Sequence, residues 1–137
     1  MARSHWLVKS EPSTYAWDDL VRDGRTRWDG VRNPLARTHL GSMRKGDLVL
    51  YYHSGVGKDV VGIARVVRES YPDPADARWL AVDLEPLRPL AARVPLAAIK
   101  ADQRLAGLAL IRQPRLSVMP VDAAHFARIV ELGKGGR

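Results

Sequence analysis

Four short segments of the chain combine aromatic rings with hydroxyl, amide and cationic side chains. They are Lys9–Pro12, Trp28–Asn33, Tyr51–Ser54 and Arg115–Val118. A flat indole ring can stack on a planar heterocycle, and nearby amides and hydroxyls can read the polar edge of that heterocycle. These residue types indicate a pocket for a nucleobase, in which the base stacks on Trp28 and Asn33 and Ser10 contact its edge.

Short strands and short helices are predicted around these four segments. Apolar runs and alternation predict strands at 5–9, 25–28, 47–53, 60–68, 79–84, 108–111 and 116–118. Helix signals predict helices over 15–22, from Pro34 to about Gly41, within 95–100, and after Asp122. The proline-rich stretch 86–94 is expected to be irregular or edge-like. Strands interleaved with short helices predict an α+β fold on a curved or closed sheet.

Asn33 has two interpretations at this stage. It precedes Pro34 at the start of a predicted helix, and Asn is a favoured helix N-cap. A capping side chain is engaged by the helix backbone, whereas a base-reading side chain must face the pocket. The sequence leaves both interpretations open.

The composition is that of a soluble globular protein. The chain has 137 residues, of which 46% are hydrophobic and 27% are charged. We expect a single domain over residues 1–137, with its core at about 5–132 and a flexible tail at 133–137. The first residues lack the apolar run of a signal peptide, and no stretch is long enough for a membrane helix. A cytoplasmic location is the default expectation.

Several kinds of site are excluded or disfavoured. The chain has no cysteine, which rules out disulfides and thiolate metal ligands. Its four histidines are widely spaced, so we expect neither a metal nor a cofactor. The turn at 54–58 does not fit the phosphate-binding loop pattern, and no arrangement of serine, histidine and carboxylate suggests a triad. We therefore expect no catalytic residue, and a nuclease or base-processing hydrolase is the weaker alternative.

The net charge of +7 is unevenly distributed. Residues 22–45 carry seven basic and two acidic side chains, and residues 104–137 carry six and two. Two basic segments that meet in space would form a surface that attracts phosphate groups. The alternative is a basic surface without a nucleic-acid partner, which composition alone does not exclude.

Five motifs along the chain resemble the EVE domain family, which belongs to the PUA-like superfamily and is related to YTH domains. The motifs are His5–Pro12, Trp28–Asn33, Asp47–Ser54, Val61–Ala64 and Arg115–Val118. The resemblance implies a PUA-like β-pseudo-barrel surrounded by short helices. It also implies a pocket that holds a flipped-out modified base, typically a modified cytosine in DNA, without catalysis.

The resemblance assigns roles to ten residues of this chain. The residues expected to line or support the base pocket are Ser10, Trp28, Val31, Asn33, Tyr52, His53 and Ser117. The residues expected at its phosphate-facing rim are Lys9, Arg32 and Arg115. The implied partner is nucleic acid that carries a modified base, with DNA favoured and RNA, including tRNA, as an alternative. We expect no membrane partner and a monomeric protein.

Overall fold

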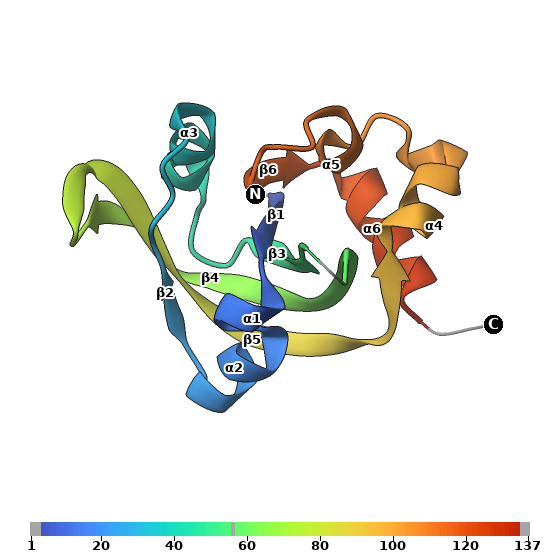
Figure 1. The fold of residues 1–137 in the computed structure, drawn as a ribbon, viewed down its shortest axis with the longest axis horizontal. Helices are drawn as coiled ribbons and strands as arrows, with labels where there is room; N and C mark the ends of the chain where they lie inside the picture. The colour runs from blue at the N-terminus through green and yellow to red at the C-terminus, as the bar shows by residue number, and fades with distance from the viewer. Residues whose placement is uncertain (1–3, 56, 135–137) are drawn as a thin grey trace.

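The computed structural model describes residues 4–55 and 57–134, and its centre is a six-stranded mixed sheet (Figure 1). The strands are β1 (His5–Ser10), β2 (Thr26–Trp28), β3 (Leu48–His53), β4 (Asp59–Asp73), β5 (Asp76–Pro95) and β6 (Val118–Val121). Their order across the sheet is β2-β5-β4-β3-β1-β6. Strands β1 and β3 are parallel, and the other neighbours are antiparallel.

Short helices surround this sheet, which confirms the predicted α+β class. They are α1 (Pro12–Tyr15), α2 (Trp17–Asp23), α3 (Pro34–Ser42), α4 (Leu96–Ala101), α5 (Ala109–Arg112) and α6 (Ala123–Leu132), with a 3-10 turn at Gln103–Leu105. In Figure 1, α3 stands near the tip of the β4–β5 hairpin, while α4, α5 and α6 gather at the opposite end. Within residues 4–55 and 57–134, no helix has the length and apolarity to cross a membrane.

The sheet is open rather than closed. Strands β2 and β6 are its two edges, and no ladder joins them in the part of the chain that the structure describes. The helices therefore close the core where a complete barrel would have further strands. The pseudo-barrel implied by the sequence is thus an open sheet covered by helices.

The central strands supply most of the core. Leu7, Leu50, Tyr51 and Ile63 are fully buried, as their apolar strands predict. Trp6 and Trp17, which are each 6% exposed, join the same core.

The β4–β5 hairpin is longer than predicted. Strand β4 continues to Asp73 where a turn was expected, and β5 continues through the proline-rich stretch 86–94. Shifts of register, which mark bulges, interrupt the pairing of β4 with β5. Beyond Leu84, β5 has no strand partner on its other side among the described residues. An edge of this kind tolerates prolines, because a residue whose N–H would face outward contributes no hydrogen bond to the ladder.

One strand prediction and one helix prediction also need correction. The apolar run 108–111 was predicted as a strand, but residues 109–112 form the single turn α5. A short buried run does not distinguish strand from helix by periodicity alone. The helix predicted over 15–22 is divided at Ala16, whose backbone is extended, so that α1 and α2 meet at a corner.

Gly62 provides a test of how α2 packs on the sheet. A Cβ atom at Gly62 would lie 2.7 Å from three ring atoms of Trp17, which is closer than packed atoms allow. We predict that Gly62→Ala lowers the free energy of unfolding by about 1–3 kcal/mol through overpacking. Urea denaturation followed by circular dichroism measures the change.

Gly107→Ala is the matched control for this variant. Its Cβ would lie 3.7 Å from Cε1 of His125, an ordinary contact distance, so its stability should change by no more than about 0.5 kcal/mol. Equal stability of the two variants would contradict the close packing of Trp17 on β4.

Candidate functional site

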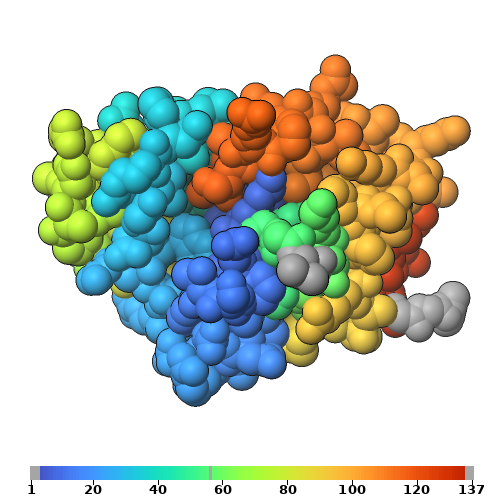
Figure 2. Space-filling view, in the orientation of Figure 1, coloured from blue at the N-terminus to red at the C-terminus, as the bar shows by residue number. Residues whose placement is uncertain are grey.

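A hollow of about 520 Å³ opens where the end of β1, the end of β2 and the 113–117 loop come together. Six of the ten residues singled out from the sequence line it: Lys9, Ser10, Trp28, Val31, Arg32 and Ser117. Figure 2 shows the contributing segments on one face, with β1 and α1 in blue, the 28–33 segment and α3 in light blue to cyan, and the 113–117 loop in orange.

Backbone pairing brings the first wall of the hollow together. Strand β1 pairs with β3 so that Ser10 lies opposite His53 and Lys9 lies opposite Tyr52. On the other side of β1, the Lys9 amide donates to the Ser117 carbonyl at 3.0 Å. Residues from three distant parts of the sequence thus meet at one end of two parallel strands.

The carbonyl oxygen of Tyr15 fixes the α1–α2 corner against this wall. It accepts a hydrogen bond from Ser10 Oγ at 2.7 Å and another from Tyr51 Oη at 2.9 Å. Burial raises the pKa of Tyr51, so its hydroxyl remains protonated and continues to donate. The proton of Ser10 is engaged in the same way, and the Ser10 side chain lies beside the Tyr51 hydroxyl at the edge of the hollow.

His53 holds the same corner from the buried side. It is 4% exposed, and its Nε2 accepts a hydrogen bond from the Trp17 amide at 3.0 Å. An accepting Nε2 requires the ring proton on Nδ1. Burial lowers the pKa of His53, which favours this neutral form. His53 therefore supports the hollow without lining it.

Trp28 forms the second wall. It ends β2, where it pairs with Val82 of β5, and its side chain is half-buried. Its ring meets Tyr51 edge to face, with the centroids 5.5 Å apart and an interplanar angle of 80°. Tyr51 thus fixes the orientation of the indole ring that lines the hollow.

The carboxylate of Asp73 fixes the segment after Trp28. Its Oδ2 accepts from the Gly30 amide at 2.9 Å and from Arg32 Nη1 at 3.0 Å, and its Oδ1 accepts from the Ala75 amide at 2.8 Å. The bonds from the Gly30 and Ala75 amides lower the pKa of Asp73 to about 2, and Arg32 adds to this effect. Gly30 has a φ of +75°, a conformation that other residues adopt at a cost.

Arg32 is engaged in holding this segment. Besides its bond to Asp73, it donates to the Val31 carbonyl at 3.0 Å, and its guanidinium lies 5.7 Å from the ring centroid of Trp79. Its side chain is still 40% exposed. Arg32 lines the hollow and orders it at the same time.

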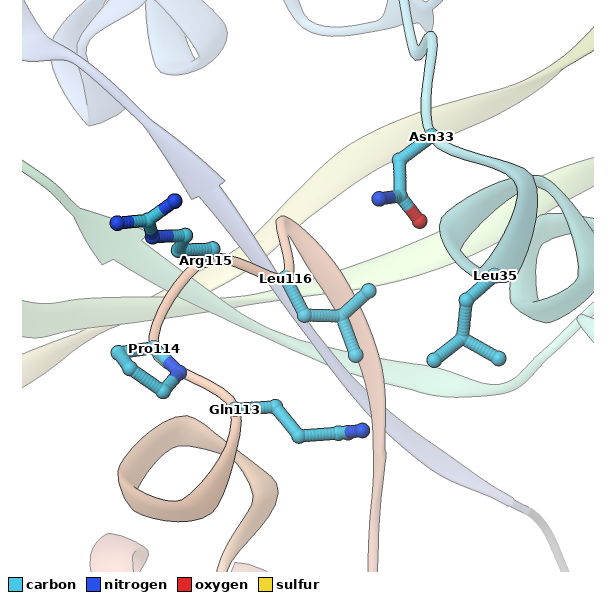
Figure 3. A pocket seen from close by; sticks show the side chains of 6 residues that line it. All are labelled: Asn33, Leu35, Gln113, Pro114, Arg115 and Leu116. Atoms are coloured by element: carbon cyan, nitrogen blue, oxygen red, sulfur yellow. The ribbon is translucent and has the colours of Figure 1, made fainter.

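Two predicted residues, Asn33 and Arg115, line a neighbouring hollow of about 440 Å³ (Figure 3). The side chain of Leu116 lies between them, and that of Leu35 lies on the same side as Asn33 (Figure 3). Asn33 Oδ1 accepts from the Ala36 amide at 2.9 Å, which confirms the N-cap interpretation. The cap leaves the amide nitrogen, which Figure 3 shows on the side of the 113–117 loop, without a hydrogen bond in the described residues.

Tyr52 lines a third hollow, of about 320 Å³, on the other side of Lys9. It is only 3% exposed, and Lys9 Nζ lies 5.9 Å from its ring centroid. The sequence-based set is therefore divided among three adjacent hollows, with His53 behind the first of them. Lys9 is common to the first and third, and Pro114 to the second and third.

The first hollow also has lining residues that the sequence did not single out. They are Glu11, Thr14, Tyr15, Thr26, Arg27, Asp29 and Gly30. Glu11, Asp29 and Gly30 lie inside the motifs that carried the resemblance, so extending the set to the whole motifs would have included them. Thr14 and Tyr15 reach the hollow only because the chain bends at Ala16, and nothing in the local sequence announces that bend.

Comparison with known proteins assigns the chain to a family. The EVE domain model matches residues 4–132, which is most of the chain, and the chain therefore belongs to the EVE domain family. A protein of Rhodopseudomonas palustris solved by NMR matches with a TM-score of 0.91 at 48% identity, over 95% of this chain and 92% of that one.

Vertebrate relatives are more distant in sequence. Thymocyte nuclear protein 1 from Homo sapiens is 28% identical, over 94% of this chain and 73% of its own length. A crystal structure of the human THYN1 protein in complex with DNA containing 5-methylcytosine matches with a TM-score of 0.91 at 28% identity. That match covers 98% of this chain and 99% of the other.

The role of His53 predicts a pH dependence of stability. Because the folded pKa is lowered from 6.5, unfolding takes up a proton below about pH 6.5. The contribution of His53 to the free energy of unfolding is fully present above that pH. It declines as the pH falls, by at most about 1.4 kcal/mol per pH unit for one group. We predict that His53→Gln, which keeps an acceptor but cannot titrate, flattens the decline between pH 7 and pH 5.

The matched control for His53 is His39→Gln. Burial also lowers the pKa of His39, so the His39→Gln variant should remove only the part of the decline in stability that His39 causes. Urea titrations at a series of pH values measure the slopes. A slope in His53→Gln equal to that of the wild type would show that His53 does not accept from the Trp17 amide.

The three bonds of Asp73 predict that this residue orders the 28–32 segment. We expect Asp73→Asn to speed hydrogen exchange of the Gly30 amide and to cost about 1–3 kcal/mol of stability, because a buried acceptor for Arg32 is weakened. Asp76→Asn, in the same hairpin, removes a carboxylate that bonds to Arg78, and it should leave the Gly30 amide protected. Hydrogen exchange measured by NMR separates the two outcomes.

Proposed function

We propose that this protein binds nucleic acid, in the first place DNA, and holds one flipped-out modified base in the 520 Å³ hollow without turning it over. The observation that carries the proposal is the half-buried indole ring of Trp28 lining a hollow that also exposes hydroxyl and carboxylate oxygens. Membership of the EVE family and the likeness to THYN1, solved with 5-methylcytosine DNA, favour a modified cytosine as the base.

The energetics of base flipping define what the hollow must provide. Extruding a base from a duplex costs a few kcal/mol of stacking and pairing. Stacking on one aromatic ring returns about 1–3 kcal/mol. The rest has to come from hydrogen bonds to the base edge and from contacts to the phosphate backbone.

The polar groups of the hollow suit a base that donates hydrogen bonds. Ser10 lines the hollow with its proton held by the Tyr15 carbonyl, and the carboxylate of Glu11 lies at the same end of β1. Carboxylates accept well from the exocyclic amino group of cytosine. The hydroxyl of Ser117 adds a group that can donate or accept.

Recognition of the methyl group itself is expected to be modest. Burying one methyl-sized group contributes about 0.8 kcal/mol. Val31, which is 8% exposed, provides an apolar contact within the hollow. We therefore propose a preference of about fourfold for the methylated base over cytosine, from apolar contact alone.

The remaining predicted residues take supporting roles in this proposal. Arg32, Tyr52 and His53 hold the walls in place, and Lys9 stands at the boundary of the hollow. Asn33 and Arg115, in the adjoining hollow, face the strand on either side of the flipped base. Their amide and guanidinium groups are suited to phosphate and sugar oxygens.

Substitution of Trp28 tests the proposal. We predict that Trp28→Ala weakens binding of a 5-methylcytosine duplex about 10-fold or more and removes the preference over the unmodified duplex, because the stacking surface is lost. Fluorescence anisotropy at fixed salt measures both affinities. Salt must be constant because the phosphate contribution alone changes affinity steeply.

Trp79→Ala is the control for Trp28→Ala. Trp79 is also half-buried, but it contacts the guanidinium groups of Arg32 and Arg37 instead of lining the hollow. This variant should keep the preference for the methylated duplex. Equal preference in Trp28→Ala and the wild type would reject Trp28 as the stacking surface.

Two further arms of the same experiment test whether the partner is DNA or RNA, and whether the protein changes the bound base or strand chemically. Tighter binding to RNA of matched sequence, through contacts to 2′-hydroxyls, would replace DNA by RNA as the partner. Release of a base or cleavage of the labelled strand, with or without magnesium, would replace a binding module by an enzyme.

A further inference from the structure

The third hollow carries an unusual concentration of positive charge. Its lining includes the side chains of Lys9, Lys58 and Lys100, three of the five lysines of the chain. No acidic residue is among its lining residues in the described part of the chain. The carboxylate of Glu11 borders the hollow, since its Oε2 would lie 3.0 Å from a Cβ atom at Gly55.

Two of these lysines have no counter-ion. Lys58 and Lys100 are exposed, and neither takes part in an ion pair within residues 4–55 and 57–134. Many arginines of the chain, in contrast, are paired with carboxylates, as Arg25 is with Asp83 and Arg128 with Asp102. Unpaired like charges that face one concavity repel one another, and an anion placed between them relieves that repulsion.

Lys9 is poised to bind a further acceptor. Its Nζ donates to the Pro114 carbonyl at 2.7 Å, which engages one of the three protons of the ammonium group. Burial lowers the pKa of Lys9 because it disfavours the charged ammonium group. An anionic ligand that accepts from the remaining protons stabilises this charged form. The apolar floor formed by Tyr52, Leu96 and Leu110 excludes water and strengthens such a contact.

The location of this hollow connects it to the base site. Lys9 lines both the 520 Å³ hollow and this one of about 320 Å³, and its neighbour Ser10 lines only the first. A nucleotide whose base enters the first hollow has its own phosphates at the border between the two. Lys9 stands at that border, and Lys58 and Lys100 line the third hollow beside it, so a phosphodiester of the same strand is the occupant that fits their charge.

We propose that Lys9, Lys58 and Lys100 form a binding site for a backbone phosphate next to the flipped nucleotide. The inference rests on the proposed function and adds the contact that holds the strand while the base is extruded. Lys58 and Lys100 contribute affinity without reading the base, because phosphate contacts carry no sequence information.

The test combines lysine variants with phosphate-neutral DNA. The variant Lys58→Gln/Lys100→Gln is titrated with 5-methylcytosine and unmodified duplexes from 50 to 300 mM salt. We expect its affinity for the methylated duplex to fall about 10-fold at 150 mM and the slope of log K against log salt to decrease by about 1–2. The preference for the methylated base should stay within twofold of the wild-type value.

Methylphosphonate substitution locates the contact. Replacing the phosphates one at a time, over three positions on each side of the modified base, should weaken wild-type binding at one or two positions next to that base. The same substitutions should have no effect in the double lysine variant. Lys45→Gln removes an exposed lysine outside all three hollows and should retain both the wild-type slope and the methylphosphonate effect.

The outcomes separate the two proposals. A wild-type protein without preference for the methylated duplex would overturn the proposed function, whatever the lysine variants do. A preserved preference, together with a methylphosphonate effect that persists in the double variant, would overturn only the phosphate site. If the double lysine variant loses no more affinity than Lys45→Gln, the three lysines act only as part of a diffuse basic surface, and the phosphate site is overturned.

Discussion

The structure depends on one backbone oxygen, the carbonyl of Tyr15, which accepts hydrogen bonds from two hydroxyl groups, one on β1 and one on β3. Two residues further along, the amide of Trp17 donates to His53 of β3. The corner between α1 and α2 is therefore fixed by three side chains of the sheet. Leaving any of these buried groups without a partner costs about 1–3 kcal/mol. Because the same corner supplies a wall of the hollow, the hydrogen bonds that stabilise the core here also set the geometry of the site.

A second anchor acts from the opposite side of the molecule. The long β4–β5 hairpin carries Asp73 under the 28–32 segment, where it binds Gly30 and Arg32. Trp28 lies between the two anchors, with its ring set by Tyr51. Many hydrogen-bonding groups around the hollow bond to one another and hold its walls in place. Such preorganisation lowers the entropic cost of binding a ligand. In the proposed function, selectivity rests on other polar residues that line the hollow, chiefly Ser10, Glu11 and Ser117.

The sequence predicted those parts of the structure that local chemistry determines. The apolar run before His53, the Asn33-Pro34 helix start and the helix after Asp122 all appear as expected. The extension of β5 past Pro86 was missed because it depends on which edge of the strand is unpaired, a property of the sheet and not of the segment. The bend at Ala16 was missed because His53 and Ser10, from other strands, hold it. The motif residues lie close together in the fold, but their division among three hollows follows from packing alone.

The position of β1 has a consequence for biosynthesis. This strand lies between β3 and β6, so that Trp6 pairs with Val49 on one side and with Pro120 on the other. A ribosome that adds about 5–20 residues per second delivers the second neighbour several seconds after the first strand emerges. Until then β1 has an open edge, the feature of nascent sheets that most invites association between chains. The site wall that contains Ser117 is thus among the last parts of the molecule to form, and a chain that stops short of β6 has neither a complete sheet nor a complete hollow.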